Sequence, residues 1–335
     1  MKIIALTFGS ESCASTYFRI HQYREGLASR GISFECTPAD RFHDWPSLAG
    51  YDVVILQKRL FGGRALKPIR RHARRLIYDI DDAIWLPHGK RHHWITRLRT
   101  AWRLQQTVRS ADLCLAANER ICSKLTACGG TARVLPMALD ENEWTFPERP
   151  PESRLRIGWA GSPANLRYLA AIGPEIQHVL KTHDGTELII FSGAKPEFGR
   201  DLPYTHIPFE SGKEAEVVRS FEVGLLPLPG DPFSAHKSPI KALQYMASGA
   251  AIAATVIGAT QELLEADVTA LSVPTPDDWQ GTVSRLVRDA ALRRRLRTAA
   301  RQRFERTFSL SRNTELLIDH LQSMVRVPPH DDGRR

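Results

Sequence analysis

The chain has 335 residues, of which 42% are hydrophobic and 25% charged, an ordinary globular composition with enough length for two domains. No apolar run approaches the ~20 residues that a membrane-spanning helix needs. The first apolar segment (2–8) is too short for a signal-peptide core, so we interpret it as a β-strand. The five cysteines form no CxxC pair, which favours reduced thiols in a cytoplasmic protein.

The net charge of +9 is concentrated in the first half of the chain. Residues 1–150 contain 23 basic and 15 acidic residues, whereas residues 151–335 contain 23 and 22. In the segment 89–103, tryptophans, Ile95 and Leu98 are interleaved with arginines, which is typical of a helix on a membrane surface; a solvated helix face is the alternative. The pattern leaves open a peripheral contact with the anionic inner face of a membrane. No recognisable module supports a nucleic-acid partner.

Short apolar runs alternate with helical patterns along the chain. In the first part we expect strands at 2–8, 33–37, 52–57, 75–80, 112–118 and 132–137. Residues 141–154 are rich in proline and charge and are expected to form a linker. In the second part we expect strands at 155–161, 187–193, 204–209, 222–228, 250–255 and 269–273.

Continuous apolar strands that alternate with helices predict an α/β protein with doubly wound parallel sheets. Two such sets predict two Rossmann-like domains, at 1–140 and 155–309. An amphipathic helix is expected near the end, at 310–325, and residues 327–335 are expected to be disordered. Because ligands of such folds bind beyond the carboxyl ends of the strands, the loops at those ends are candidate sites.

The stretch HKSPIKALQYMASG, which begins at His236, predicts a helix with Ser238 as its N-cap, Pro239 at its first position and a closing glycine. Lys237 and Lys241 then lie beside the helix start, where the helix dipole disfavours cations unless an anion shares the site. We therefore predict a diphosphate site at this helix start. Ordinary surface lysines are the alternative.

The stretch GWAGSPANLRYL (158–169) leads from a strand through a loop of small residues into a helix. A phosphate could lie at this helix start beside Ser162 and Asn165. The usual dinucleotide-binding pattern GxGxxG is absent, and a plain capped turn is the alternative.

The stretch YDIDDAIW (78–85) places an Asp-x-Asp pair at a strand end. One interpretation is a Mg²⁺-dependent phosphohydrolase that uses Asp79 and Asp81, although the Thr or Val expected two residues after the second Asp is missing. We favour the interpretation that these carboxylates position an acceptor hydroxyl or cap the next helix. His88 and His92 are spaced for a metal only if both are helical, and no Glu or Cys completes a site, so we expect no metal.

These motifs resemble those of a known family. IGWAGSPANLRYL, EVGLLPLPGDPF, HKSPIKALQYMASGAAIAAT and VIGATQELL are similar to the nucleotide-binding domain of GT-B glycosyltransferases of family 4. YDIDDAIWLPHG and STYFRIHQYREGLASRGI resemble first-domain segments of a bacterial subgroup with a Lys-x-x-x-Lys-x-x-Gln-Tyr motif. The resemblance covers most of residues 1–325. It implies a GT-B fold, with two Rossmann-like domains facing a cleft and helix 310–325 returning to the first domain.

The resemblance implies retaining, metal-independent transfer of a sugar from a nucleotide-diphosphate sugar to a saccharide, glycolipid or natural product. It implies no cofactor besides the donor, and a role in polysaccharide or glycoconjugate biosynthesis. His236 and Gln244 replace the two glutamates usual in the family; a glutamine still forms hydrogen bonds with a ribose, while the role of His236 stays open. The replacement leaves a non-catalytic sugar-nucleotide-binding partner as an alternative, besides the phosphohydrolase.

The expected catalytic residues are His236, Lys237, Lys241, Asp81 and Asp82. The expected donor-binding residues are Gly161, Ser162, Asn165, Arg167, Gly193, Ser238, Pro239, Ile240 and Gln244. The expected acceptor-side residues are Gly9, Ser10, Arg19, Arg59, Asp79, His88 and Asn118. Ion pairs within the fold explain Arg19 and Arg59 equally well.

Overall fold

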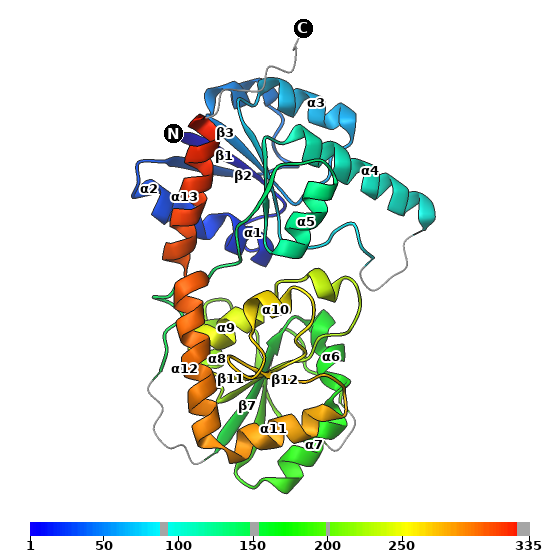
Figure 1. The fold of residues 1–335 in the computed structure, drawn as a ribbon, viewed down its shortest axis with the longest axis vertical. Coiled ribbons are helices and arrows are strands. Elements are labelled where there is room, and N and C mark those ends of the chain that lie inside the picture. The colour runs from blue at the N-terminus through cyan, green and yellow to red at the C-terminus, as the bar shows by residue number, and fades with distance from the viewer. Residues whose placement is uncertain (88–92, 148–153, 199–201, 327–335) are drawn as a thin grey trace. The chain divides into compact units, whose positions relative to one another are not determined.

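The computed structural model describes residues 1–87, 93–147, 154–198 and 202–326. These residues form two compact units (Figure 1). Unit 1 consists of Met1–Ala138, His236–Ser238 and the chain from Leu310 onward. Unit 2 consists of Leu139–Ala235 and Pro239–Ser309. The segments 88–92 and 327–335, which include His88, His92 and the expected tail, lie outside the described residues.

The sheet of unit 1 has six parallel strands in the order β2-β1-β3-β4-β5-β6. They are β1 (Lys2–Thr7), β2 (Ser33–Pro38), β3 (Val53–Gln57), β4 (Leu76–Ile80), β5 (Leu113–Ala116) and β6 (Ala132–Val134). Every residue of β3, β4 and β5 is buried, as their predominantly apolar sequences favour. All six predicted strands are confirmed, although β6 ends three residues earlier than expected.

Alternate side chains of these strands pack on opposite faces of the sheet. On one face, Ile4 and Leu6 belong to a core with side chains of helices α3 (Gly63–His72), α4 (Trp94–Ser110) and α5 (Glu119–Ala127). On the other face, Ile3 and Ala5 belong to a core with Tyr23. This second core also contains side chains of α2 (Arg24–Ala28) and of α13 (Leu310–Arg326), the last described helix, which lies beside α2 (Figure 1). Short helices α1 (Ala14–Arg19), η1 (His21–Tyr23) and η2 (Trp45–Gly50) complete unit 1.

The sheet of unit 2 has six parallel strands in the order β12-β11-β10-β7-β8-β9. They are β7 (Leu155–Gly161), β8 (Thr186–Ser192), β9 (Thr205–Pro208), β10 (Val223–Leu226), β11 (Ala251–Ala254) and β12 (Leu271–Ser272). The helical elements are η3 (Pro163–Asn165), α6 (Leu166–Ala170), α7 (Gly173–Thr182), α8 (Glu214–Arg219), η4 (Ser234–His236), α9 (Ile240–Ser248), α10 (Thr260–Leu263), α11 (Asp278–Arg288) and α12 (Ala290–Thr307). All six predicted strands are confirmed here too.

Helix α9 begins one residue later than the sequence predicts. Its first residue is Ile240, and Pro239 occupies the N-cap position with an extended backbone. Ser238 does not cap the helix, because its hydroxyl accepts a hydrogen bond from the amide of Asn118 at 2.8 Å. The predicted end is confirmed: Gly249 adopts the left-handed conformation (φ 70°) that closes a helix. Lys241 thus lies in the first turn, as expected.

Candidate functional site

Unit 2 contains a topological switch point between strands β7 and β10. From β7 the chain continues to β8 and β9 on one side of the sheet, then returns to β10, β11 and β12 on the other. Ligands of doubly wound sheets bind beyond the carboxyl ends of the strands at such a point. The predicted residues Gly161 and Ser162 come at the end of β7, and α9 follows β10. The topology therefore brings the two donor-binding motifs to the same edge of the sheet.

Tyr245 fixes α9 against the two strands of the switch point. Its buried hydroxyl accepts a hydrogen bond from the Ala160 N–H at 3.1 Å and donates one to the Leu225 carbonyl at 3.3 Å. A side chain at Gly224 would meet the Tyr245 ring at 2.8 Å, so this strand position requires glycine. Helix α9 is thereby tied to both strands of the switch point.

Three side chains of unit 2 form a polar cluster beside this edge. The Gln244 amide of α9 donates a hydrogen bond to Oε2 of Glu214 at 2.9 Å. The Lys241 ammonium lies 3.7 Å from the same oxygen. Glu214 is the first residue of α8, which packs against α9. The cluster therefore joins a cation and a carboxylate from two neighbouring helices.

Gln244, which the resemblance assigns to a ribose contact, lies in the interior of unit 2. Its side chain is fully buried (0% exposed), and its amide already binds Glu214. Its Oε1 atom has no hydrogen-bond partner among the described residues. A buried acceptor without a hydrogen-bond partner costs about 1–3 kcal/mol of stability, so this oxygen is an unsatisfied buried acceptor.

The environment of Lys241 favours the arrival of an anion. Burial lowers the pKa of its ammonium below the ordinary value, and the attraction of Glu214 offsets only part of this effect. Because Glu214 is 3.7 Å away and partly exposed, the lysine charge is incompletely compensated. A diphosphate at the start of α9 would compensate it.

The other predicted donor-side residues lie at the end of β7, in the short helical elements that follow it, and just after β8. Gly161 ends β7, and a Cβ atom there would meet the Trp159 ring at 2.4 Å. Gly193 follows β8 and lies in ordinary van der Waals reach of Pro163, so the two loops are neighbours. Arg167 stacks on the Tyr168 ring and donates to its hydroxyl at 2.8 Å. The predicted helix after this loop is split into α6 and α7, and Asn165 lies in the short η3 turn without capping a helix by its side chain.

Unit 1 has its own switch point, between β1 and β3, and a second polar cluster lies there. Lys58, directly after β3, binds Asp82 and lies 3.1 Å from Oδ1 of Asp81. Ser15 donates to the other oxygen of Asp81 at 2.7 Å. Burial alone would lower the pKa of Lys58, but the charges of Asp81 and Asp82 outweigh it and raise the pKa, so the lysine stays protonated.

Lys58 holds its place at a conformational cost. Its backbone is in the left-handed region (φ 59°), which non-glycine residues rarely adopt and which costs about 1–3 kcal/mol. The pKa of Asp81 is lowered although burial acts against this, because the Lys58 charge and the Ser15 hydrogen bond stabilise its ionised form. Asp82 is the more exposed of the two carboxylates. The cluster can accept hydrogen bonds from a ligand hydroxyl through Asp82.

Arg19 and Asp79 form a buried pair behind this cluster. The Arg19 guanidinium binds both carboxylate oxygens of Asp79 and donates to the carbonyl of Leu135 at 2.6 Å. Burial lowers the pKa of Arg19, but the charge of Asp79 more than compensates and raises it, so the guanidinium stays protonated. Burial raises the pKa of Asp79, and the charge and hydrogen bond of Arg19 offset only part of this effect. These two predicted acceptor-side residues therefore support the cluster from within the fold.

The remaining predicted residues have mixed placements. Asn118 caps α5 by accepting from the Ile121 N–H at 2.9 Å. It also donates a hydrogen bond to the carbonyl of His236 at 2.8 Å. The His236 ring lies edge-on to the ring of Trp85. Gly9 donates its N–H to Thr16, Ser10 shares a hydrogen bond with Ser12, and Arg59 stacks on Phe61. Lys237 is half-buried and forms no ion pair within the described part of the chain.

The described residues contain no cluster of His, Cys, Asp or Glu that could hold a metal ion. The three aspartates of the Asp79–Asp82 stretch are already bound to Arg19 and Lys58. A magnesium site here would have to displace these cations, which weakens the phosphohydrolase interpretation.

Two comparisons with known proteins gave no relative: no family model and no curated protein matches the chain. Solved structures do match. HepE from Anabaena, in complex with UDP and glucose, has 14% sequence identity and a TM-score of 0.69, covering 96% of this chain and 100% of its own. Sucrose-phosphate synthase from Thermosynechococcus elongatus has 14% identity and a TM-score of 0.71, covering 97% and 99%. The apo lipopolysaccharide outer core galactosyltransferase WaaB has 13% identity and a TM-score of 0.65, covering 96% and 99%.

The chain has the GT-B fold. This confirms the predicted fold class, two Rossmann-like units built on parallel sheets. At 13–14% identity these similarities establish the fold alone.

Sequence reasoning missed two residues of the polar clusters, Lys58 and Glu214. Lys58 follows the carboxyl end of β3, where ligands of such folds bind, but the sequence analysis predicts its neighbour Arg59 as the site residue. Glu214 had no local signal, because it follows an unremarkable Gly-Lys turn. Charge balance predicts a carboxylate near the half-buried Lys241, but it does not show which residue provides it.

Proposed function

We propose that this protein transfers a sugar from a nucleotide-diphosphate sugar to a hydroxyl group of an acceptor, with retention of the anomeric configuration and without a metal ion. The observation that carries the proposal is Lys241, a half-buried and incompletely compensated cation at the first turn of α9, beside the switch point of unit 2. The GT-B fold, shared with structures that contain UDP or UDP-glucose, agrees with a nucleotide donor there.

The residues would divide the work between donor and acceptor. Lys241, with Lys237 and the first amides of α9, would stabilise the negative charge that develops on the leaving diphosphate. Asp82, held by Lys58, would orient the acceptor hydroxyl. The acceptor oxygen forms a bond to the anomeric carbon as the bond from that carbon to the diphosphate oxygen breaks, and the hydroxyl proton passes to the departing diphosphate. His236 stays a candidate for a contact with the donor sugar.

The first test is thermal stabilisation by UDP, GDP, ADP, dTDP and their sugar conjugates, with and without Mg²⁺. A ligand at ~100 times its dissociation constant adds about 2.7 kcal/mol to the stability of the protein. We expect one nucleotide to stabilise the wild type without metal, and Lys241→Ala to lose the effect. Lys181→Ala, an exposed lysine on α7, is the matched control and should keep it. The proposal fails if no nucleotide stabilises the wild type, or if stabilisation needs Mg²⁺.

A transfer assay with that donor then separates an enzyme from a binding partner. Binding without transfer or hydrolysis would support the non-catalytic alternative, to which the replacement of two glutamates by His236 and Gln244 points. The phosphohydrolase alternative would require activity that depends on Mg²⁺ and is lost in Asp79→Asn.

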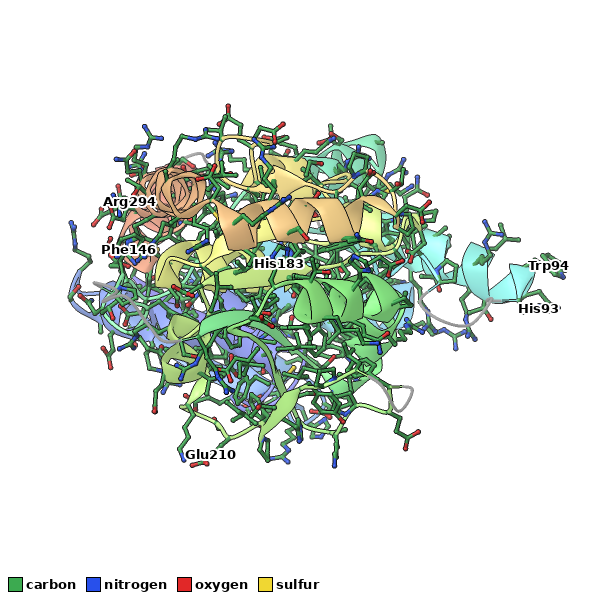
Figure 2. All side chains as sticks on the ribbon, turned by 90° about the horizontal axis from the view of Figure 1, so that it is seen from below. His93, Trp94, Phe146, His183, Glu210 and Arg294 are labelled. Atoms are coloured by element: carbon green, nitrogen blue, oxygen red, sulfur yellow. The ribbon has the colours of Figure 1, made fainter. Side chains whose placement is uncertain are left out.

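We further propose that unit 1 contacts an anionic membrane at its cytoplasmic face through α4. The described part of the chain contains no helix with the length and hydropathy needed to span a bilayer. Helix α4 nevertheless presents large apolar side chains to solvent at helical spacing: Trp94, Ile95, Leu98 and Trp102. Trp94 and Leu98 are 63% and 62% exposed. Figure 2 shows His93 and Trp94 at the outer end of this helix, pointing away from unit 1.

The charge of α4 selects the kind of surface it would contact. The helix contains four arginines, at 97, 99, 103 and 109, and no acidic residue. The neighbouring α3 is equally free of acidic residues and contains Arg64, Lys67, Arg70 and Arg71. Apolar side chains interleaved with arginines suit the interface of an anionic bilayer, whereas a second copy of α4 would oppose arginine to arginine.

A further inference from the structure

We infer that Glu214 binds a vicinal diol of the nucleotide-sugar donor, and that Gln244 and Lys241 hold its carboxylate in place. The inference rests on the proposed function. It assigns to α8 a donor contact that the sequence motif places on α9.

The first step concerns which group of the cluster a ligand can reach. The Gln244 side chain is fully buried, whereas about a quarter of the Glu214 side chain is exposed (25%). The Gln244 amide donates to Glu214 at 2.9 Å and so stands behind the carboxylate. A ligand at the edge of the sheet would meet Glu214 before it met Gln244.

The second step concerns the free hydrogen-bonding capacity of the carboxylate. Both contacts of Glu214, from Gln244 and from Lys241, end on the same oxygen, Oε2. Among the residues that the structure describes, no hydrogen bond reaches its Oε1. The two contacts orient the group, and a carboxylate with one oxygen fixed offers the other to a donor. The buried Oε1 of Gln244, also without a partner, is an independent sign that the cluster is incomplete as it stands.

The third step concerns the chemistry of the ligand group that would donate hydrogen bonds to Glu214. The Glu214 carboxylate accepts hydrogen bonds, so the ligand group that it binds has to be a hydrogen-bond donor, whereas Lys241 is the group assigned to phosphate. A neutral pair of adjacent hydroxyls fits, because each can donate to a carboxylate oxygen. A nucleotide-diphosphate sugar has such pairs in its ribose and in many transferred sugars.

A plainer role for Glu214 would be to neutralise Lys241. That role predicts a general change in nucleotide affinity when Glu214 is replaced. It does not predict any change in discrimination between a ligand with the diol and one without it. Selectivity is therefore the readout that separates the two roles.

The experiment measures affinities by calorimetry for UDP, ADP and GDP, for their 2′-deoxy forms, and for UDP-glucose, ADP-glucose and GDP-mannose. The proteins are the wild type, Glu214→Ala, Glu214→Gln and the control Glu216→Gln, an exposed carboxylate on the same helix. If the diol is that of the ribose, the wild type prefers the ribonucleotide by about tenfold or more, since hydrogen bonds to a charged group are worth that much. If the diol is that of the transferred sugar, the increase in affinity from the nucleotide to its nucleotide sugar is larger than the preference for the ribonucleotide over the 2′-deoxy form.

Whichever of these two affinity ratios is large in the wild type should fall to within about twofold of unity in Glu214→Ala. It should stay unchanged in Glu216→Gln. Retention of both ratios in Glu214→Ala, measured on protein with a wild-type melting curve, overturns the inference and leaves the proposed function intact. Failure of every nucleotide to bind the wild type overturns both. A Gln244→Leu variant that folds should weaken the same ratio, which a purely structural glutamine would not affect.

Discussion

At the scale of single residues, the ion pair of Arg19 and Asp79 combines deep burial with complete pairing. Removal of one member of such a pair leaves a buried charge without a partner, which costs about 3–5 kcal/mol. We therefore predict that Asp79→Asn lowers the free energy of unfolding by this amount in urea titrations. The double variant Arg19→Met/Asp79→Leu should recover most of the loss.

The matched control for this prediction is Glu35→Gln, which breaks the half-exposed pair with Lys2. Exposed pairs are worth about 0–1 kcal/mol, so this variant should be nearly neutral. A loss under ~1 kcal/mol in Asp79→Asn would contradict a buried pair that stabilises the fold.

Lys241 gives the second prediction at this scale, a pH dependence of nucleotide affinity. Its pKa is lowered by burial, so the ammonium loses its proton at a lower pH than an ordinary lysine does. UDP affinity should be full below this pKa and decline as the pH rises through it. Glu214→Gln removes the carboxylate that raises the pKa, so its decline should begin at a still lower pH. Lys241→Arg should show no decline in this range, because a guanidinium stays protonated. Identical pH profiles of wild type and Lys241→Arg, measured by calorimetry, would refute this role.

The limits of prediction from sequence are clearest among these residues. The place of Lys241 in the first turn of α9 was predicted because its signal is local, a cation within a short helix-start motif. Glu214 was not, because it meets Gln244 across 30 residues of chain, and Lys58 meets Asp82 across 24. Such pairings depend on which strands become neighbours, and a single sequence does not state this.

At the scale of elements, α9 shows how local signals compete with tertiary contacts. The Ser-Pro pair predicted the helix to within one residue, but the Ser238 hydroxyl is used by Asn118 and does not cap it. The strands were recovered with small shifts at their ends, because buried parallel strands are uninterrupted apolar runs.

The end of α9 gives a test of that local structure. At Gly249 (φ 70°), a Cβ atom would also lie 2.6 Å from the Phe146 ring. Gly249→Ala should therefore cost more than the ~1–2 kcal/mol of left-handed backbone alone. Gly212→Ala is the control, since φ is also positive there (87°) but no atom lies within 4 Å. Equal losses for the two variants in thermal unfolding would show that the contact with Phe146 relaxes freely.

Helix α4 carries the prediction for the membrane contact. We expect the protein to sediment with phosphatidylcholine vesicles only when they also contain phosphatidylglycerol, and to dissociate as salt rises. Trp94→Ser and Leu98→Ser should each weaken binding by about tenfold, since burial of a large apolar side chain is worth about 1.5–3 kcal/mol. Val268→Ser, an exposed apolar residue of unit 2, is the control. Binding equal for both vesicle types, or a dimer in solution that Trp94→Ser dissociates, would contradict the assignment.

At the scale of the whole molecule, the two sheets could be predicted from the alternation of strands and helices along the sequence. The position of the last helix could not be predicted from that alternation. The apolar stripe of α13 showed that one face is buried, but its partner was inferred only from a family resemblance. In the structure α13 belongs to unit 1, where Leu317, Ile318 and Leu321 join the core beside Leu27 of α2.

Removal of α13 tests how far unit 1 depends on the end of the chain. A chain ended after Ser309 would expose the apolar face that Ile20, Tyr23 and Leu27 now share with α13. Hydrogen exchange should then show lost protection in α2 and β1, whereas β7 and β10 of unit 2 keep theirs. A chain ended after Arg326 is the control and should exchange like the full chain. Unchanged protection of β1 after removal of α13 would mean that the sheet and its remaining helices suffice for unit 1. Loss of protection in both units would mean instead that they unfold together, so that α13 stabilises the whole molecule.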